Sequence, residues 1–206
     1  EDGRIARAEL DDAVRRILTV KVRMGLFEHP FADEREAEAV QNALAHRQEA
    51  RWAAQRSMVL LRNEGHVLPL PTSLKRVAVI GPVADSQDAL DGSWMVFGHT
   101  SNAVTVLQGI RSRLADAVVT YAPGPEIRRE IPSYFDTVLP GARKEAQPAA
   151  VADAAFADAV AVARQADTVV MVLGESSDMA GEAASRASLG LAGRQQELLE
   201  AVVSLG

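Results

Sequence analysis

A group of side chains suited to acid–base chemistry lies between residues 174 and 190, after a strand-like run. Glu175, Asp178 and Glu182 place three carboxylates in this segment, and Arg186 adds a guanidinium. In a site built from paired carboxylates, one carboxyl group donates a proton to a leaving group. Gly174 and Gly181 in this segment permit unusual backbone angles near a ligand. The competing interpretation is a solvated polar loop, which describes most loops of this composition.

Other catalytic and binding chemistries lack the residues that they need. Gly81 and Pro82 follow a strand-like run, but neither G-x-G-x-x-G nor G-x-x-x-x-G-K-[ST] occurs, and Pro82 lacks the backbone N–H that a phosphate loop uses. The four histidines show no H-x-x-x-H spacing, there is no cysteine, and G-x-S-x-G is missing. We therefore expect no nucleotide, no metal, no cofactor and no serine or thiol nucleophile.

The carboxylate segment follows the most hydrophobic of three short apolar runs. These runs are rich in β-branched residues and end at glycine or proline, which is typical of strands buried on both faces; they cover residues 77–80, 118–121 and 168–173. Helical periodicity follows each run, at about 105–115, 151–165 and 192–205. This order predicts an α/β fold, a mostly parallel sheet flanked by helices. Functional loops of such sheets follow the carboxyl ends of the strands, here at 81–104, 122–150 and 174–190.

The first 74 residues show a different, helical pattern. Apolar residues share one face over 8–24, and Gly25 stands where a C-terminal cap belongs; the face consists of Leu10, Val14, Ile17 and Leu18. A second helix is predicted from Asp33, as the N-terminal cap, to about Ser57. The apolar run 58–61 is either the last turn of that helix or a short strand.

Composition and charge are those of a soluble globular protein. The 206 residues carry 22 Lys and Arg against 28 Asp and Glu, a net charge of -6, and 48% are hydrophobic. The acidic balance argues against a dedicated nucleic-acid binder, which shows a basic stripe. No apolar run approaches the ~18 residues of a membrane helix, so we expect no membrane partner. Because the chain begins at Glu1, we expect it to be part of something longer, and a missing targeting signal says nothing about location.

Several segments, in order and spacing, resemble glycoside hydrolase family 3, the family of β-glucosidases and β-xylosidases. Residues 13–27 resemble the end of the family's barrel domain, and 54–64 with 68–70 resemble its linker. Residues 77–82 and 92–94 resemble the first strand of its second domain and the loop after it. Gly174-Glu175, Met179, 182–186 and Gln195 resemble the loop and helix that carry the catalytic acid.

The resemblance implies a domain organisation and an activity. Residues 1–30 would form the C-terminal helix of a (β/α) barrel domain, 31–74 a helical linker and entry segment, and 75–206 an α/β sandwich domain, C-terminally incomplete. The implied activity is that of a retaining, exo-acting β-glycosidase that hydrolyses terminal non-reducing β-linked sugars, most often glucose, without a cofactor. Its implied partners are an oligosaccharide or β-glycoside and the barrel domain of the same protein. A periplasmic or secreted location is implied, with a cytoplasmic one left open.

The resemblance also assigns roles to single residues. The acid/base glutamate of the family precedes a Ser-Arg pair, which here points to Glu182. Glu175 would be a supporting carboxylate, and Arg186 would hold the loop or its carboxylates, or form an ordinary surface salt bridge. Trp94 is either a sugar-stacking platform or, as favoured, a buried core residue, and His99 a polar surface residue. The nucleophilic aspartate would lie upstream of residue 1, so the isolated chain is expected to be inactive.

Two departures from the family pattern leave alternatives open. Ser188 stands where the family usually has Asp, and Ala192 where it usually has the Pro that opens the next helix. A helix can begin without proline, so Ala192 does not argue against the predicted fold. The competing interpretations are a non-catalytic α/β binding or interaction module and a pseudo-enzyme whose loop has drifted.

Overall fold

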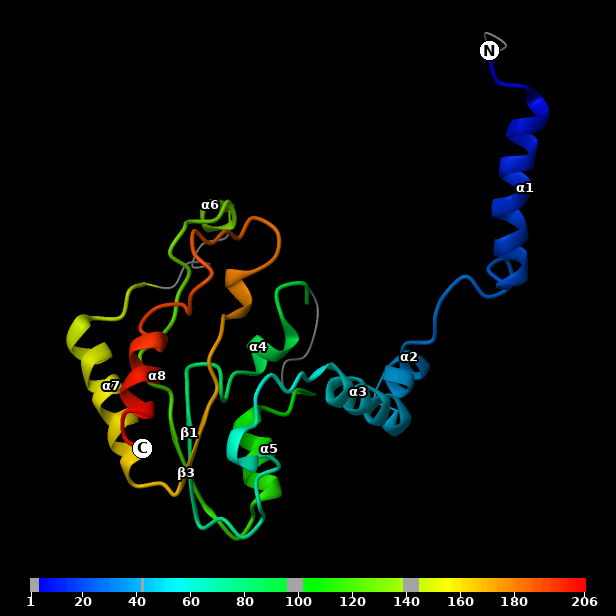
Figure 1. Cartoon of the computed structure of the whole chain (residues 1–206). Helices are drawn as coiled ribbons and strands as arrows, with labels where there is room; N and C mark the ends of the chain where they lie inside the picture. Colours follow the sequence, from blue (N-terminus) through cyan, green and yellow to red (C-terminus); the bar gives the residue numbers. More distant parts are fainter. Residues whose placement is uncertain (1–3, 42, 96–101, 139–144) are drawn as a thin grey trace. The chain divides into compact units, whose positions relative to one another are not determined.

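The structure is a computed structural model that describes residues 4–41, 43–95, 102–138 and 145–206. The chain divides into two compact units, Glu1–Glu64 and Gly65–Gly206, and Figure 1 labels most of their helices and strands. Within the described ranges, no helix combines the length and the apolar character that crossing a membrane requires.

The first unit opens with α1 (Arg7–Arg23), which confirms the predicted helix and its cap. Beyond the helix, Gly25 adopts a positive φ of 67°. The N–H of Leu26 donates to the carbonyl of Lys21 and that of Gly25 to Val22, both at 3.0 Å. These are the two bonds of a Schellman cap, which satisfies carbonyl groups left over at the helix end.

The predicted second helix is in fact two helices, α2 (Glu34–Gln41) and α3 (Leu44–Ser57). Asp33 caps α2 as expected, because its Oδ1 accepts the N–H groups of Arg35 and Glu36 at 2.9 and 3.4 Å. The prediction of one continuous helix is wrong because Ala43 is extended, with φ -57° and ψ 131°, at the start of α3. Glycine and proline, the usual signals of a break, are missing there.

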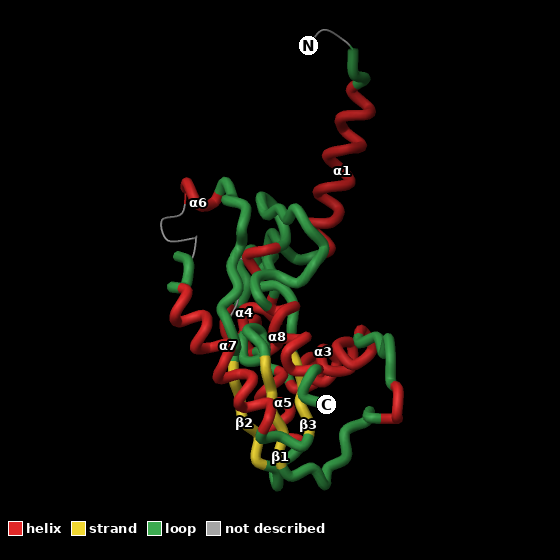
Figure 2. Tube along the Cα trace, turned by 60° about the vertical axis from the view of Figure 1, so that its left-hand side comes forward, coloured by secondary structure: helices red, strands yellow, loops and turns green. Residues whose placement is uncertain are grey.

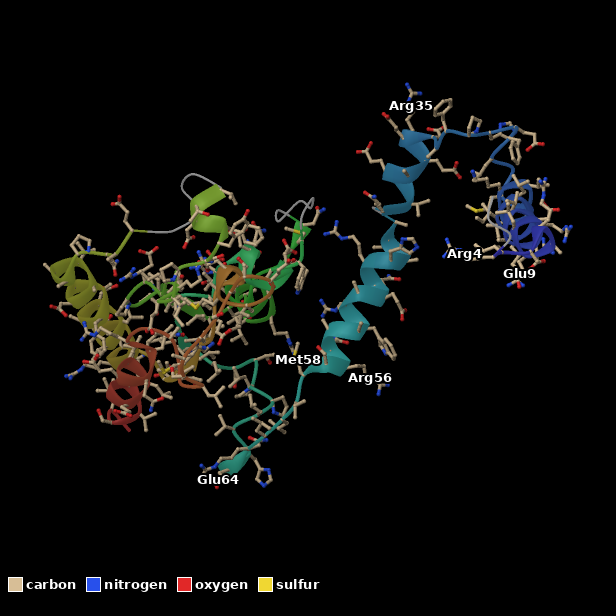
Figure 3. The ribbon with its side chains drawn as sticks, turned by 90° about the horizontal axis from the view of Figure 1, so that it is seen from above. Arg4, Glu9, Arg35, Arg56, Met58 and Glu64 are labelled. Atoms are coloured by element: carbon tan, nitrogen blue, oxygen red, sulfur yellow. The ribbon has the colours of Figure 1, made fainter. Side chains whose placement is uncertain are left out.

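The helices of the first unit bury no residue among those described. Figure 3 shows its side chains standing out around the ribbons, with Arg35 on α2, Arg56 near the end of α3 and Met58 just after it. The apolar run 58–61 is neither helix nor strand, and its side chains are 63–92% exposed.

The second unit contains a three-stranded sheet in the order β2-β1-β3, with both pairs parallel (Figure 2). The strands are β1 (Arg76–Ile80), β2 (Val118–Ala122) and β3 (Thr168–Met171). This confirms the predicted α/β class. Burial on both faces holds only for β1, since β2 alternates and β3 is half-buried. In β2, Val119 and Tyr121 pack in the core around Leu107, whereas Val118 and Thr120 on the opposite face are exposed.

Helices cover both faces of the sheet (Figure 1). On one face α5 (Val106–Arg113) packs through Leu107 against Val77 and Val79. On the other, α7 (Ala149–Arg164) and α8 (Gln195–Val203) pack against Ala78 and Ile80. Alternate side chains of β1 therefore enter two separate cores. The loops also hold short elements, namely α4 (Gln87–Asp91), α6 (Phe135–Val138), η1 (Glu64–His66) and η3 (Ser177–Met179).

Gly81 follows the last residue of β1 and lies against Val172, just beyond β3. Its φ is 138°, and a Cβ at this position would lie 2.0 Å from the carbonyl oxygen of Val172. The N–H of Val172 in turn donates to the carbonyl of Ile80 at 2.7 Å. Only glycine permits this approach, which brings the loops after β1 and β3 together at the carboxyl edge of the sheet.

We expect Gly81→Ala to lower the free energy of unfolding by about 2–5 kcal/mol, because a backbone oxygen blocks the added methyl group and the φ angle is strained. Gly109→Ala is the matched control, since Gly109 lies in α5 with open space around its Cβ position. There the same change should raise stability by about 0.5–1 kcal/mol. Urea titration checks both, and equal effects would contradict the role given to Gly81.

Candidate active site

The loop between β3 and α8 is closed at its base by the side chain of Gln195. Its Oε1 accepts the N–H of Gly174 at 2.9 Å, and its Nε2 donates to the carbonyl of Gly174 at 2.8 Å and to that of Ala192 at 2.9 Å. Gln195 is only 2% exposed. Both backbone groups of Gly174 are thus satisfied by one amide, and the ends of the loop are tied together.

Next to Gln195, Arg194 joins α8 to α7. Its guanidinium donates to Asp153 at 2.6 Å and to Glu197 at 2.7 and 2.9 Å. The guanidinium also lies 4.7 Å from the ring centroid of Phe156. Hydrogen bonding to Arg194 lowers the pKa of Glu197 below its ordinary value. The start of α8, which carries Gln195, is therefore fixed from a neighbouring helix.

An ion pair crosses the loop from Arg186 to Glu175, and Arg186 also donates to the carbonyl of Gly190. The side chains of Arg186 and Glu175 are 23% and 41% exposed. Of the loop's glutamates, the structure thus brings Arg186 to Glu175 and not to Glu182.

Glu182 stands at the corner of a four-residue turn. The N–H of Ala184 donates to the carbonyl of Gly181 at 3.3 Å, and Gly181 and Ala183 both have positive φ, 92° and 59°. A positive φ at the third residue is the mark of a type II turn, a position that favours glycine. Alanine there is held at a cost on the order of 1 kcal/mol. Glu182 is exposed and makes no hydrogen bond or ion pair with any described residue.

Trp94 lies beside this turn. A Cβ on Gly181 would meet Ser93 Oγ at 2.7 Å and Trp94 Cε2 at 3.6 Å, so the backbone at Gly181 abuts the loop after β1. The favoured prediction of a buried core tryptophan is wrong for this chain, because Trp94 is 69% exposed. His99 lies outside the described residues. The structure therefore brings Trp94 to the turn that carries Glu182.

The loop that follows β2 (residues 122–150, the middle loop) packs through buried side chains against the loop of residues 174–190 (the carboxylate loop). Met179 is 4% exposed and packs in one cluster with Ile127 and Ala192. Ala192, which departs from the family pattern, belongs to this cluster, and its carbonyl accepts a hydrogen bond from Gln195. Ser188, the other departure from that pattern, is exposed. The sequence analysis missed Arg129 of the middle loop, which reaches the carbonyl of Asp178 at 3.0 Å.

The described residues offer little room for a ligand between these loops. The hollow lined by Met179, Arg186 and Ser188, with residues of the middle loop, measures about 20 Å³, which suits one water molecule and not a sugar. In the same parts of the chain, no group of three or more His, Asp or Glu side chains could hold a metal ion. The arrangement can present one free carboxyl group and one exposed indole to a ligand bound against this edge.

Comparison with known proteins gives a family match over most of the chain. Residues 58–206 match the model described as the glycosyl hydrolase family 3 C-terminal domain. A periplasmic beta-glucosidase of Salmonella typhimurium is 39% identical over 218 residues, covering 100% of this chain and 28% of that protein. A beta-xylosidase of Formosa agariphila is 31% identical over 204 residues, covering 96% of this chain and 25% of that protein.

Solved structures of beta-glucosidases are also similar to this chain. A beta-glucosidase involved in saponin metabolism from intestinal bacteria superposes with a TM-score of 0.75 at 33% identity, covering 98% of this chain and 28% of that one. The beta-glucosidase of Listeria innocua in complex with glucose gives a TM-score of 0.72 at 30% identity, covering 100% and 25%. The chain thus spans 25–28% of the length of these relatives.

We expect Gln195→Leu to lower the free energy of unfolding by about 2–4 kcal/mol, because the N–H and carbonyl groups of Gly174 lose their partner. Gln196→Ala is the control: the side-chain amide of Gln196 donates to Glu200 Oε1 at 2.8 Å on the exposed face of α8. That change should cost no more than about 0.5 kcal/mol. Urea titration of the two variants checks the difference, and similar losses would show that Gln195 does not close the loop.

Proposed function

This chain belongs to glycosyl hydrolase family 3, and we propose that it forms part of a retaining, exo-acting β-glycosidase that hydrolyses terminal non-reducing β-linked sugars. In this proposal the chain supplies the acid/base carboxylate, Glu182. The observation that carries the proposal is the free, exposed position of Glu182 on a strained turn beside Trp94, at the carboxyl edge of a parallel sheet. Ligands bind at that edge in α/β sheets.

The choice of Glu182 over Glu175 follows from their partners. Glu175 is held by the guanidinium of Arg186. A carboxyl group that is already engaged with a guanidinium is not free to approach a leaving group. Glu182 has no such partner among the described residues. We therefore assign proton transfer to Glu182, and to Glu175 and Arg186 the task of fixing the loop around it.

The mechanism that fits this assignment uses two carboxyl groups on opposite sides of the sugar. Glu182 would protonate the leaving oxygen while a nucleophilic carboxylate attacks the anomeric carbon. Glu182, now ionised, would then activate the water that releases the sugar. We assign the nucleophile to an aspartate of a barrel domain outside these 206 residues, so the chain alone should be inactive.

Trp94 would contribute a binding surface. Its indole is 69% exposed and lies against the turn that carries Glu182. A flat aromatic face of this kind can stack on the apolar face of a sugar ring. We propose that it contacts the substrate next to the scissile bond and needs no movement of the core to do so.

The remaining organisation follows from the same proposal. Residues 1–30 would close the barrel domain, 31–74 would link it to the sandwich domain of 75–206, and the barrel and a β-glycoside would be the chain's partners. The described residues in the helices of the first unit are not buried, which fits a segment that packs on another domain. Because a similar protein is named a periplasmic beta-glucosidase, we propose a periplasmic or secreted location.

In the full-length protein, Glu182→Ala should slow aryl β-glucosides with poor leaving groups by about 10²–10⁴-fold, the usual contribution of a general acid. Substrates with good leaving groups should form the glycosyl-enzyme at nearly the normal rate, and this intermediate should accumulate because its hydrolysis lacks a base. Azide attacks without a base, so it should restore turnover and yield a β-glycosyl azide. Steady-state rates and product analysis check this expectation.

Glu175→Ala is the matched control from the same loop, and azide should not rescue it. Azide rescue of Glu175→Ala together with none for Glu182→Ala would show that the wrong carboxylate is assigned. Sugar binding without turnover in the unaltered full-length protein would favour the pseudo-enzyme instead.

Trp94→Ala should reduce kcat/KM of the full-length protein by about 10-fold, through loss of an aromatic contact and its buried area. Trp94→Phe keeps a ring and should retain most of the activity. The melting temperature should stay within about 2 °C in both variants, because the side chain is largely exposed. A large drop in melting temperature with no selective loss in kcat/KM would instead favour the interpretation of Trp94 as a core residue.

A further inference from the structure

Arg129 is a buried cation that joins two loops far apart in the sequence. It follows β2, and its side chain is 7% exposed. Its Nη1 donates to the carbonyl oxygen of Asp178 at 3.0 Å, and its Nη2 donates to the carboxylate of Asp136. Asp178 precedes Glu182 by four residues. One side chain thus ties the middle loop to the segment that carries the proposed acid.

The orientation of this guanidinium is set from its own loop. The side chain of Asp136 is 12% exposed, and its second oxygen accepts the N–H of Ser133 at 2.8 Å. The Nε of Arg129 is buried and has no hydrogen-bond partner among the described residues. Burying a guanidinium with one donor unsatisfied is costly, so a fold that only needed apolar packing here would do better with an apolar residue.

Apolar packing is in fact already present at the same point. Met179, the next residue after Asp178, is buried with Ile127 and Ala192. The charged contact therefore adds something that packing does not: a directional bond to one backbone carbonyl. Glu182 makes no hydrogen bond or ion pair with the described residues, so its place depends on how the chain before and after it is held.

We propose that Arg129 is a positioning residue that sets the location of Glu182 by holding the carbonyl of Asp178 from the middle loop. This inference rests on the function proposed above. It differs from a merely structural ion pair in its consequence, because a shifted acid impairs proton donation specifically. A structural defect instead lowers the amount of folded enzyme and affects all substrates alike.

The test compares Arg129→Met, Arg129→Lys and the control Arg128→Met in the full-length protein. Arg128 is the neighbouring arginine, and its side chain is exposed. The readout is kcat/KM for aryl β-glucosides with poor and with good leaving groups. In Arg129→Met the ratio of poor to good should fall by about 10-fold or more, because only poor leaving groups need the proton. Arg129→Lys should lose less, and Arg128→Met should keep the normal ratio.

A second readout is independent of activity. Backbone amides of residues 176–184 should exchange with solvent faster in Arg129→Met, while those of β1 stay unchanged. If Arg129→Met fails to fold, Arg129→Lys decides, since it keeps a cation beside Asp136. An unchanged leaving-group ratio, or unchanged exchange in the loop, overturns the proposal. If the unaltered protein hydrolyses no β-glycoside, the proposed function fails, and the exchange data alone decide whether Arg129 holds the loop.

Discussion

The amide of Gln195 bonds to both backbone groups of Gly174, and the rest of the candidate site depends on this contact. It joins Gly174, just beyond the end of β3, to the first residue of α8, and so it closes the loop between them at its base. A closed loop loses much of the conformational freedom that would otherwise oppose a fixed arrangement. The close approach at Gly81 then sets the loop after β1 against it.

Within the closed loop, the two glutamates have different surroundings. Glu175 lies next to the strand end and pairs with Arg186, whereas Glu182 occupies the corner of a turn with positive φ on both sides. The backbone strain at Ala183 is held by contacts elsewhere, which is common where a side chain must be presented in one orientation. The same loop thus contains one carboxylate that is paired with a cation and one that has no such partner among the described residues.

The sequence predicts the sheet well because each strand is a short β-branched run that ends at glycine or proline. It fails for β2: Val119 and Tyr121 pack in the core while Val118 and Thr120 are exposed, and an unbroken apolar run does not encode which face is covered. The break between α2 and α3 has no glycine or proline signal. The short helices α4 and α6 span one turn each, too little for a period to be recognised.

Less of the candidate site than of the fold could be predicted from the sequence. Glu182 and Glu175 are found because they share a loop, but spacing alone does not distinguish them; their partners do. The sequence does not indicate the positive φ of Ala183, because alanine normally avoids this conformation. Arg129 and Asp178 are 49 residues apart, and only the packing of two loops brings them together.

The most direct test of this account is a crystal structure of the full-length protein with a bound glucose analogue. Retaining chemistry requires the two catalytic carboxyl groups to lie about 5–5.5 Å apart across the sugar. The account predicts Glu182 at that distance from an aspartate of the barrel, with Glu175 still paired to Arg186 and Trp94 against the sugar. A sugar flanked by Glu175, or by no carboxylate of the 174–190 loop, would contradict it.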